Sequence, residues 1–140
     1  MLRNSIHVLI AAALREERTA LERRSSELAE RRMPGIPDGD LLTGRLGGRG
    51  VALLRCGVGK VAAASSVAAA SALGPRCIIS VGSAAALHPG HRVGDVVIGT
   101  EVVQHDFAAV SATGQADPQG DKAFDPENFA PQAGAIRFVD

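Results

Sequence analysis

Apolar residues in the first hundred positions occur in short runs separated by charged or glycine-rich segments. The continuous apolar run at 6–12 is typical of a strand buried on both faces. Residues 15–32 are rich in Arg, Glu, Leu and Ala and predict a helix, which the turn residues at 33–39 should end. Two short strands are expected at 41–46 and 51–56, because the glycines between them suit a hairpin.

The pattern then repeats a helix and a strand. Small residues on every side of 60–73 predict a helix that is largely buried against a sheet. Further strands are expected at 77–81 and 93–103, and this alternation predicts an α/β fold with helices packed on a sheet. Gly, Pro, Asp and Gln dominate the end of the chain, so we expect a folded portion at 1–112 and a turn-rich tail at 113–140.

Composition narrows the class of protein. The chain has 140 residues, 46% of them hydrophobic, which is enough for the core of one domain. Fifteen Lys and Arg balance fifteen Asp and Glu, so nucleic acid is not an expected partner.

The cysteines and the longest apolar run bear on the location of the protein in the cell. Cys56 and Cys77 lie in apolar runs and predict buried free thiols in a reducing compartment. The apolar run at 6–14 is too short to span a membrane, and we therefore expect a cytoplasmic protein that does not bind membranes.

Glycine turns at strand ends supply the first candidate chemistry, because they let backbone N–H groups approach a ligand closely. The series Gly-Val-Gly-Lys-Val-Ala at 57–62 fits a dinucleotide-binding fingerprint. The next strand and its end, 77–83, lack the carboxylate expected of that fingerprint, and a plain strand-to-helix turn explains the series equally well. His88 and His91 lack further ligands at suitable spacing, so a turn is favoured over a metal site.

Several segments, taken in order, carry a family resemblance. They lie at 10–17, 42–54, 57–64, 81–84, 93–97 and, with Gln-His-Asp, 104–106. Together they resemble the N-terminal half of the 5′-methylthioadenosine/S-adenosylhomocysteine nucleosidases, in the purine nucleoside phosphorylase/uridine phosphorylase superfamily. The resemblance implies a mixed central sheet flanked by helices, with the C-terminal part of the fold missing. It also implies a homodimer that cleaves a purine thionucleoside to adenine and a thioribose without a cofactor.

The resemblance assigns roles to particular residues. Glu17 matches the glutamate that positions and deprotonates the attacking water, and its place at a helix start would favour the ionised form. The alternative is that Glu17 is one of many surface carboxylates on a charged helix. The segment that lines the purine and ribose site falls on Gly82, Ser83, Ala84 and Ala85. The family pattern there is Gly-Ser-Ala-Gly-Gly, so the alanines at 85 and 86 would disturb the pocket if those positions need positive φ.

Other features of the sequence bear on the reaction. Ser80 stands where related phosphorylases carry a phosphate-binding Arg, which favours water as the nucleophile. The second half of family members supplies a Met-Glu pair for the ribose and a Ser-Asp motif for the leaving purine, and neither dipeptide occurs here. We therefore predict that the 140-residue chain alone is inactive or nearly so. The alternatives are a non-catalytic binding or dimerisation module, a phosphate-dependent relative, and a nucleotide-binding module using 57–62.

Overall fold

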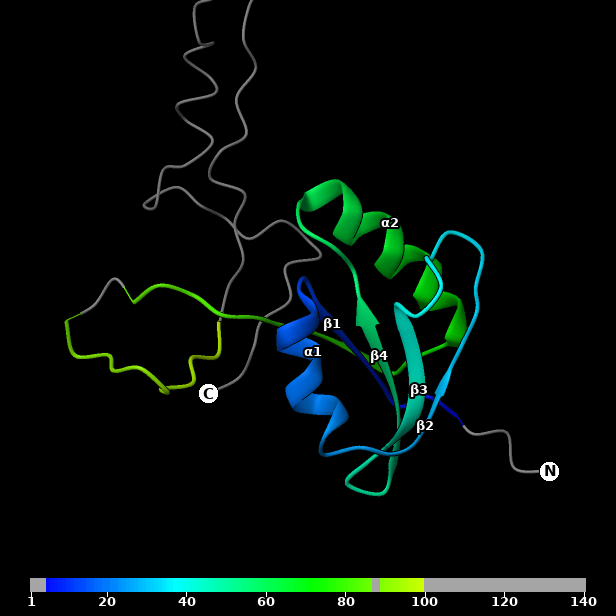
Figure 1. The fold of residues 1–140 in the computed structure, drawn as a ribbon, viewed down its shortest axis with the longest axis horizontal. Helices are drawn as coiled ribbons and strands as arrows, with labels where there is room; N and C mark the ends of the chain where they lie inside the picture. The colour runs from blue at the N-terminus through cyan, green and yellow to red at the C-terminus, as the bar shows by residue number, and fades with distance from the viewer. Residues whose placement is uncertain (1–4, 87–88, 100–140) are drawn as a thin grey trace, which may run out of the picture. The chain divides into compact units, whose positions relative to one another are not determined.

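The computed structural model describes residues 5–86 and 89–99. Contacts divide the chain into two units, residues 1–85 and 86–140. The helices and strands described below all lie in the first unit (Figure 1). In the second unit the structure describes residues 86 and 89–99, which form turns and extended chain. One turn is closed by the Asp95 carboxylate, which accepts a hydrogen bond from the Arg92 amide at 2.8 Å. The expected boundary at 112/113 lies outside the described residues and stays a prediction.

A mixed five-stranded sheet organises the first unit, in the order β2-β3-β4-β1-β5. Its strands are β1 (Val8–Ala12), β2 (Ser26–Glu30), β3 (Leu41–Leu46), β4 (Arg49–Arg55) and β5 (Cys77–Val81). β1 pairs in parallel with both β4 and β5, whereas β2, β3 and β4 are antiparallel. The expected α/β class with a mixed central sheet is therefore confirmed.

The two helices lie on opposite faces of this sheet. They are α1 (Arg15–Glu22) and α2 (Lys60–Ala70), the latter extended by the 3₁₀ turn η1 (Ser71–Leu73). Successive strand residues point to opposite faces. Leu9 accordingly packs in the cluster that includes Val67 of α2, whereas Ile10 packs in the cluster that includes Leu21 of α1. Both faces of β1 are thus buried, as its continuous apolar run predicted.

The expected hairpin joins β3 to β4. Leu46 pairs with Arg49, and the two glycines between them have φ of 57° and 77°. Positive φ at both central positions is the conformation that a tight two-residue hairpin requires, and glycine adopts it without steric cost. β4 begins at Arg49, two residues before the expected strand at 51–56.

The helix predicted over 15–32 is wrong beyond Glu22, because residues 26–30 form β2 instead. The Ser25 hydroxyl donates to the carbonyl of Leu21 at 2.9 Å just past the helix end. The chain then pairs with β3, and Leu28 joins the apolar cluster on the α1 face. Tertiary pairing has therefore overridden local helix preference, as it commonly does for an edge strand.

The expectation that α2 is largely buried is also wrong. Its buried residues are Ser66 and Ala70, and the helix therefore covers the sheet with one face. Val61 on the helix is 84% exposed, and Val58 just before it is 76% exposed. A helix of small residues all round has no polar face to mark its outer side, so its sequence does not reveal which face meets the sheet.

Two further expectations fail at the end of the first unit and beyond it. Cys77 is exposed, not buried, because within the described sheet β5 lies at an edge and pairs only with β1. Cys56 is buried as expected. The strand predicted over 93–103 is absent from its described part, since residues 93–99 form a turn and extended chain without strand pairing. Its remainder, like the expected segment at 104–106, lies outside the described residues.

Candidate active site

The candidate site lies at the carboxyl ends of the parallel strands. Ala12, the last residue of β1, pairs with Arg55 of β4 and Val81 of β5, so the three strands end at the same level. α1 begins three residues after β1, and the Gly82-Ser83 segment follows β5 directly. This edge is where open α/β sheets bind their ligands.

Glu17 and Ser83 meet there, although 66 positions separate them in the sequence. Glu17 Oε1 accepts the Ser83 amide at 3.0 Å and the Ser83 hydroxyl at 3.3 Å. Oε2 accepts the amide of Leu14, the N-cap residue of α1, at 3.0 Å. Glu17 is the third residue of the helix, where a glutamate commonly reaches back to the N-cap amide. Both carboxylate oxygens are thus held by backbone donors.

These hydrogen bonds control the charge of Glu17. Donation from the Ser83 amide, and next from the Leu14 amide, lowers the pKa of the carboxyl below its ordinary value, with partial desolvation opposing the shift. Amide donors stabilise the ionised form because they interact with its negative charge. Glu17 is therefore an oriented carboxylate at neutral pH, and its remaining lone pairs can accept a hydrogen bond from water.

The rest of the predicted segment is open to solvent. Gly82, Ser83, Ala84 and Ala85 are all exposed. A Cβ added at Gly82 would lie 3.1 Å from Glu17 Oε1, so glycine permits the close approach of the carboxylate. Among the described residues the only non-glycine with positive φ is Glu27. The alanine at 85 therefore fits its backbone conformation, and the expected φ conflict is absent at that position.

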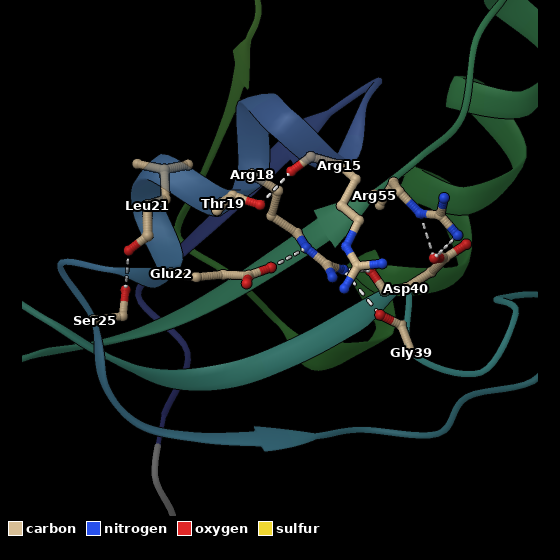
Figure 2. Close-up of polar contacts among 9 residues, drawn as sticks. All are labelled: Arg15, Arg18, Thr19, Leu21, Glu22, Ser25, Gly39, Asp40 and Arg55. Carbon is tan, nitrogen blue, oxygen red and sulfur yellow. Dashed lines mark hydrogen bonds and ion pairs between the residues drawn. The ribbon is translucent and has the colours of Figure 1, made fainter.

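An arginine network around the buried Arg18, the residue after Glu17, was not predicted from the sequence (Figure 2). Arg18 is 6% exposed. Its Nε donates to Glu22 at 2.6 Å, and its guanidinium also donates to the carbonyls of Gly39 at 3.0 Å and Asp40 at 2.8 Å. The Asp40 carboxylate in turn pairs with Arg55 at 2.5 Å. The i,i+4 spacing of Arg18 and Glu22 was a signal for the pair, but nothing in the charged run marked Arg18 as buried.

The other candidate motifs have structural roles or lie elsewhere. Gly57 and Gly59 have φ of 77° and 101° and turn the chain from β4 into α2. His91 lies 3.9 Å from Asp95, and His88 is outside the described residues. Within 5–86 and 89–99, no three His, Cys, Asp or Glu side chains are grouped to hold a metal. The described helices include none with the length and apolar character needed to cross a membrane.

Comparison with known proteins bears on the fold and the family of the chain. The 5′-methylthioadenosine/S-adenosylhomocysteine nucleosidase of Haemophilus influenzae (strain PittGG) is 41% identical over 88 residues, covering 62% of this chain and 38% of the relative. The same nucleosidase from Anoxybacillus flavithermus is 37% identical over 112 residues, covering 79% and 47%. This chain therefore spans less than half the length of these relatives.

Solved structures agree with these sequence matches. The MTA/SAH nucleosidase of Streptococcus pneumoniae, in complex with 8-aminoadenine, superposes with a TM-score of 0.66 at 32% identity. That match covers 79% of this chain and 49% of the other. The Neisseria meningitidis nucleosidase, in complex with methylthio-immucillin-A, gives a TM-score of 0.64 at 32% identity, covering 81% and 49%. The family model of the phosphorylase superfamily matches residues 7–136. The chain belongs to the phosphorylase superfamily.

Proposed function

We propose that this chain provides the water-activating half of a nucleosidase site that hydrolyses 5′-methylthioadenosine or S-adenosylhomocysteine and releases adenine. The observation that carries the proposal is the Glu17 carboxylate, held at the carboxyl edge of the sheet by the amides of Ser83 and Leu14. Relatives that are named as this nucleosidase, at 37–41% identity, support the same substrate class. The contact joins the two segments for which the sequence resemblance implied site roles.

In the proposed reaction, Glu17 acts on water. The ionised carboxylate accepts a hydrogen bond from a water molecule and orients its oxygen toward the ribosyl carbon. As the N-glycosidic bond breaks, that carbon becomes cationic, the water oxygen bonds to it, and a water proton passes to Glu17. The bond electrons leave with adenine. Its proton comes, by the family resemblance, from the Ser-Asp motif, which the 140 residues do not contain.

Water is proposed over phosphate as the nucleophile. Ser80 lies on β5, at the position where related phosphorylases carry an arginine. A neutral hydroxyl interacts with a phosphate dianion more weakly than a guanidinium, which forms charge-assisted and commonly bidentate hydrogen bonds. Adenine release that does not depend on inorganic phosphate is the expected result, and a strict phosphate requirement would identify a phosphorylase.

The proposal is tested in a chimera in which residues 5–99 of this chain replace the matching segment of the Streptococcus pneumoniae nucleosidase. We expect the chimera to release adenine from methylthioadenosine and the 140-residue chain alone to release almost none. Glu17→Gln in the chimera should lower the rate by ~10²–10⁴-fold, the usual contribution of a general base. Glu16→Gln is the matched control, because it removes a neighbouring carboxylate that is exposed on the same helix turn.

The outcomes of this assay are distinct. A Glu17→Gln chimera as active as the Glu16→Gln control would show that Glu17 is an ordinary surface carboxylate. Adenine release by the 140-residue chain at the rate of a full-length relative would refute the expected need for a second half. Binding of NAD in preference to adenine would favour the dinucleotide reading of 57–62 instead.

We further propose that the protein forms a homodimer in the cytoplasm. The dimer is supported by the exposed apolar positions Val58 and Val61 at the start of α2, since adjacent exposed apolar side chains are typical of interaction surfaces. The cytoplasmic location is supported by the two free cysteines, because the reducing conditions of the cytoplasm keep thiols unpaired. The partner of the site is a small purine nucleoside.

A further inference from the structure

Helix α1 carries Glu17, yet little in its own sequence holds it in place. It has eight residues, fewer than an isolated helix needs to be stable in water. Its single buried residue is Arg18, and its main apolar contact is the half-buried Leu21 in the cluster beneath it. Apolar packing at one position fixes the height of a helix over a sheet better than it fixes rotation about the helix axis. The orientation of α1 therefore depends on directional contacts.

Arg18 makes those directional contacts. Its guanidinium donates to two successive backbone carbonyls, Gly39 and Asp40, and to the side chain of Glu22 within the helix. The Asp40 carbonyl also accepts the Arg55 amide at 2.7 Å, so its position is fixed by the pairing of β3 with β4. The guanidinium is planar and its donors have fixed directions. Hydrogen bonds to carbonyls in fixed positions therefore also fix the orientation of α1, the helix that carries Arg18.

The contacts of Glu17 and Arg18 lie at opposite sides of the helix. Arg18 reaches the residues just before β3, whereas Glu17 reaches Ser83 just after β5. β4 and β1 lie between β3 and β5 in the sheet, so α1 bridges two strands between its two anchors. A rotation of α1 that broke the Arg18 contacts would swing the Glu17 carboxylate away from the Ser83 amide.

We propose that Arg18 is a positioning residue, whose hydrogen bonds to the Gly39 and Asp40 carbonyls orient α1 so that the Glu17 carboxylate meets the Ser83 amide. This inference rests on the proposed role of Glu17 in the reaction. Stability alone does not account for an arginine here, because replacing a buried ion pair by apolar side chains is often neutral or stabilising. What an apolar side chain cannot reproduce is the direction of the three hydrogen bonds.

The test follows the Ser83 amide by NMR in the full 140-residue chain, whose mass of 14.4 kDa per subunit suits this method. In the unsubstituted chain the Ser83 amide proton shift should titrate with the Glu17 carboxyl, and Glu17→Gln should abolish that titration. Arg18→Met is expected to remove the titration at Ser83 and to raise the Glu17 pKa toward its ordinary value. Arg18→Lys keeps the charge but not the planar fork, and should weaken the titration as well.

Arg15→Met is the matched control. It removes the same charge from an exposed position on the same helix and should leave the Ser83 titration unchanged. A normal Ser83 titration in folded Arg18→Met and Arg18→Lys chains would overturn the inference, even if both melted at lower temperature. If only Arg18→Met fails to fold, Arg18→Lys decides. If both fail while Arg15→Met folds, Arg18 is a purely structural residue and the inference is wrong. The proposed function is judged separately, by adenine release from the Glu17→Gln chimera.

Discussion

Adding a single methyl group at Gly82 should displace the Glu17 carboxylate without removing it, and so test whether its exact position matters for the reaction. In Gly82→Ala the new Cβ would lie 3.1 Å from Glu17 Oε1 and 3.6 Å from its carboxyl carbon, so the carboxylate must move by a few tenths of an ångström. Gly82 does not have positive φ, so the substitution adds no backbone strain. A 1 Å misplacement can cost ~10²-fold in rate, so a smaller shift should cost roughly 3–10-fold.

The assay is adenine release by the chimera, with kcat and KM measured separately. We expect kcat to fall and the thermal midpoint to stay nearly unchanged, because exposed substitutions usually alter stability by less than about 0.5 kcal/mol. Ala72→Gly is the control, since it changes one methyl group at an exposed position outside the candidate site. An unchanged kcat in Gly82→Ala, with a strong loss in Glu17→Gln, would refute the idea that the Ser83 contact sets the catalytic geometry.

Three further predictions address stability, pH and assembly. Leu53→Ala should destabilise the chain by about 2–5 kcal/mol in denaturant unfolding, because Leu53 is fully buried in the sheet; a loss no larger than that of an exposed substitution would contradict the core described above. The lowered pKa of Glu17 adds stability that is complete above the ordinary glutamate pKa of about 4.3 and disappears as pH falls through the lower folded value. Thermal melts between about pH 3 and 7 should therefore show a weaker acid loss in Glu17→Gln than in the unsubstituted chain, and parallel curves would argue against the shift. Val61→Glu should shift a dimer to monomer in light scattering, since Val61 is 84% exposed and apolar, and an unaltered dimer would place the interface elsewhere.

The parts of the fold that the sequence predicted well are those set by local pattern. The continuous apolar run at 6–12 predicts a buried strand because both faces of β1 are covered, and Gly47 and Gly48 adopt the positive φ that a tight turn requires. The residues at 26–30 favour a helix by local preference, whereas their strand conformation depends on pairing with β3. No local sequence pattern predicts that pairing.

The candidate site was predictable only in part, because its geometry also depends on pairing between segments that are distant in the sequence. The resemblance pointed to Glu17 and Ser83 separately, but their contact depends on the register in which Ala12 lies beside Val81. Arg18 was missed because an arginine within a run of charges reads as solvent-exposed. Its burial results from carbonyls about twenty positions away, at Gly39 and Asp40, which the charge pattern does not encode.

The central place of β1 also sets the order in which the site can form. Its partners β4 and β5 both come later in the chain, and parallel pairing between distant segments is slow because a long loop must close first. α1 can dock once β3 and β4 have brought the Gly39 and Asp40 carbonyls into place, before β5 joins the sheet. The Ser83 amide reaches Glu17 only after that last strand has paired. During refolding the Leu14 amide can lower the pKa of Glu17 as soon as α1 forms, but the larger lowering, from the Ser83 amide, should come only when β5 docks.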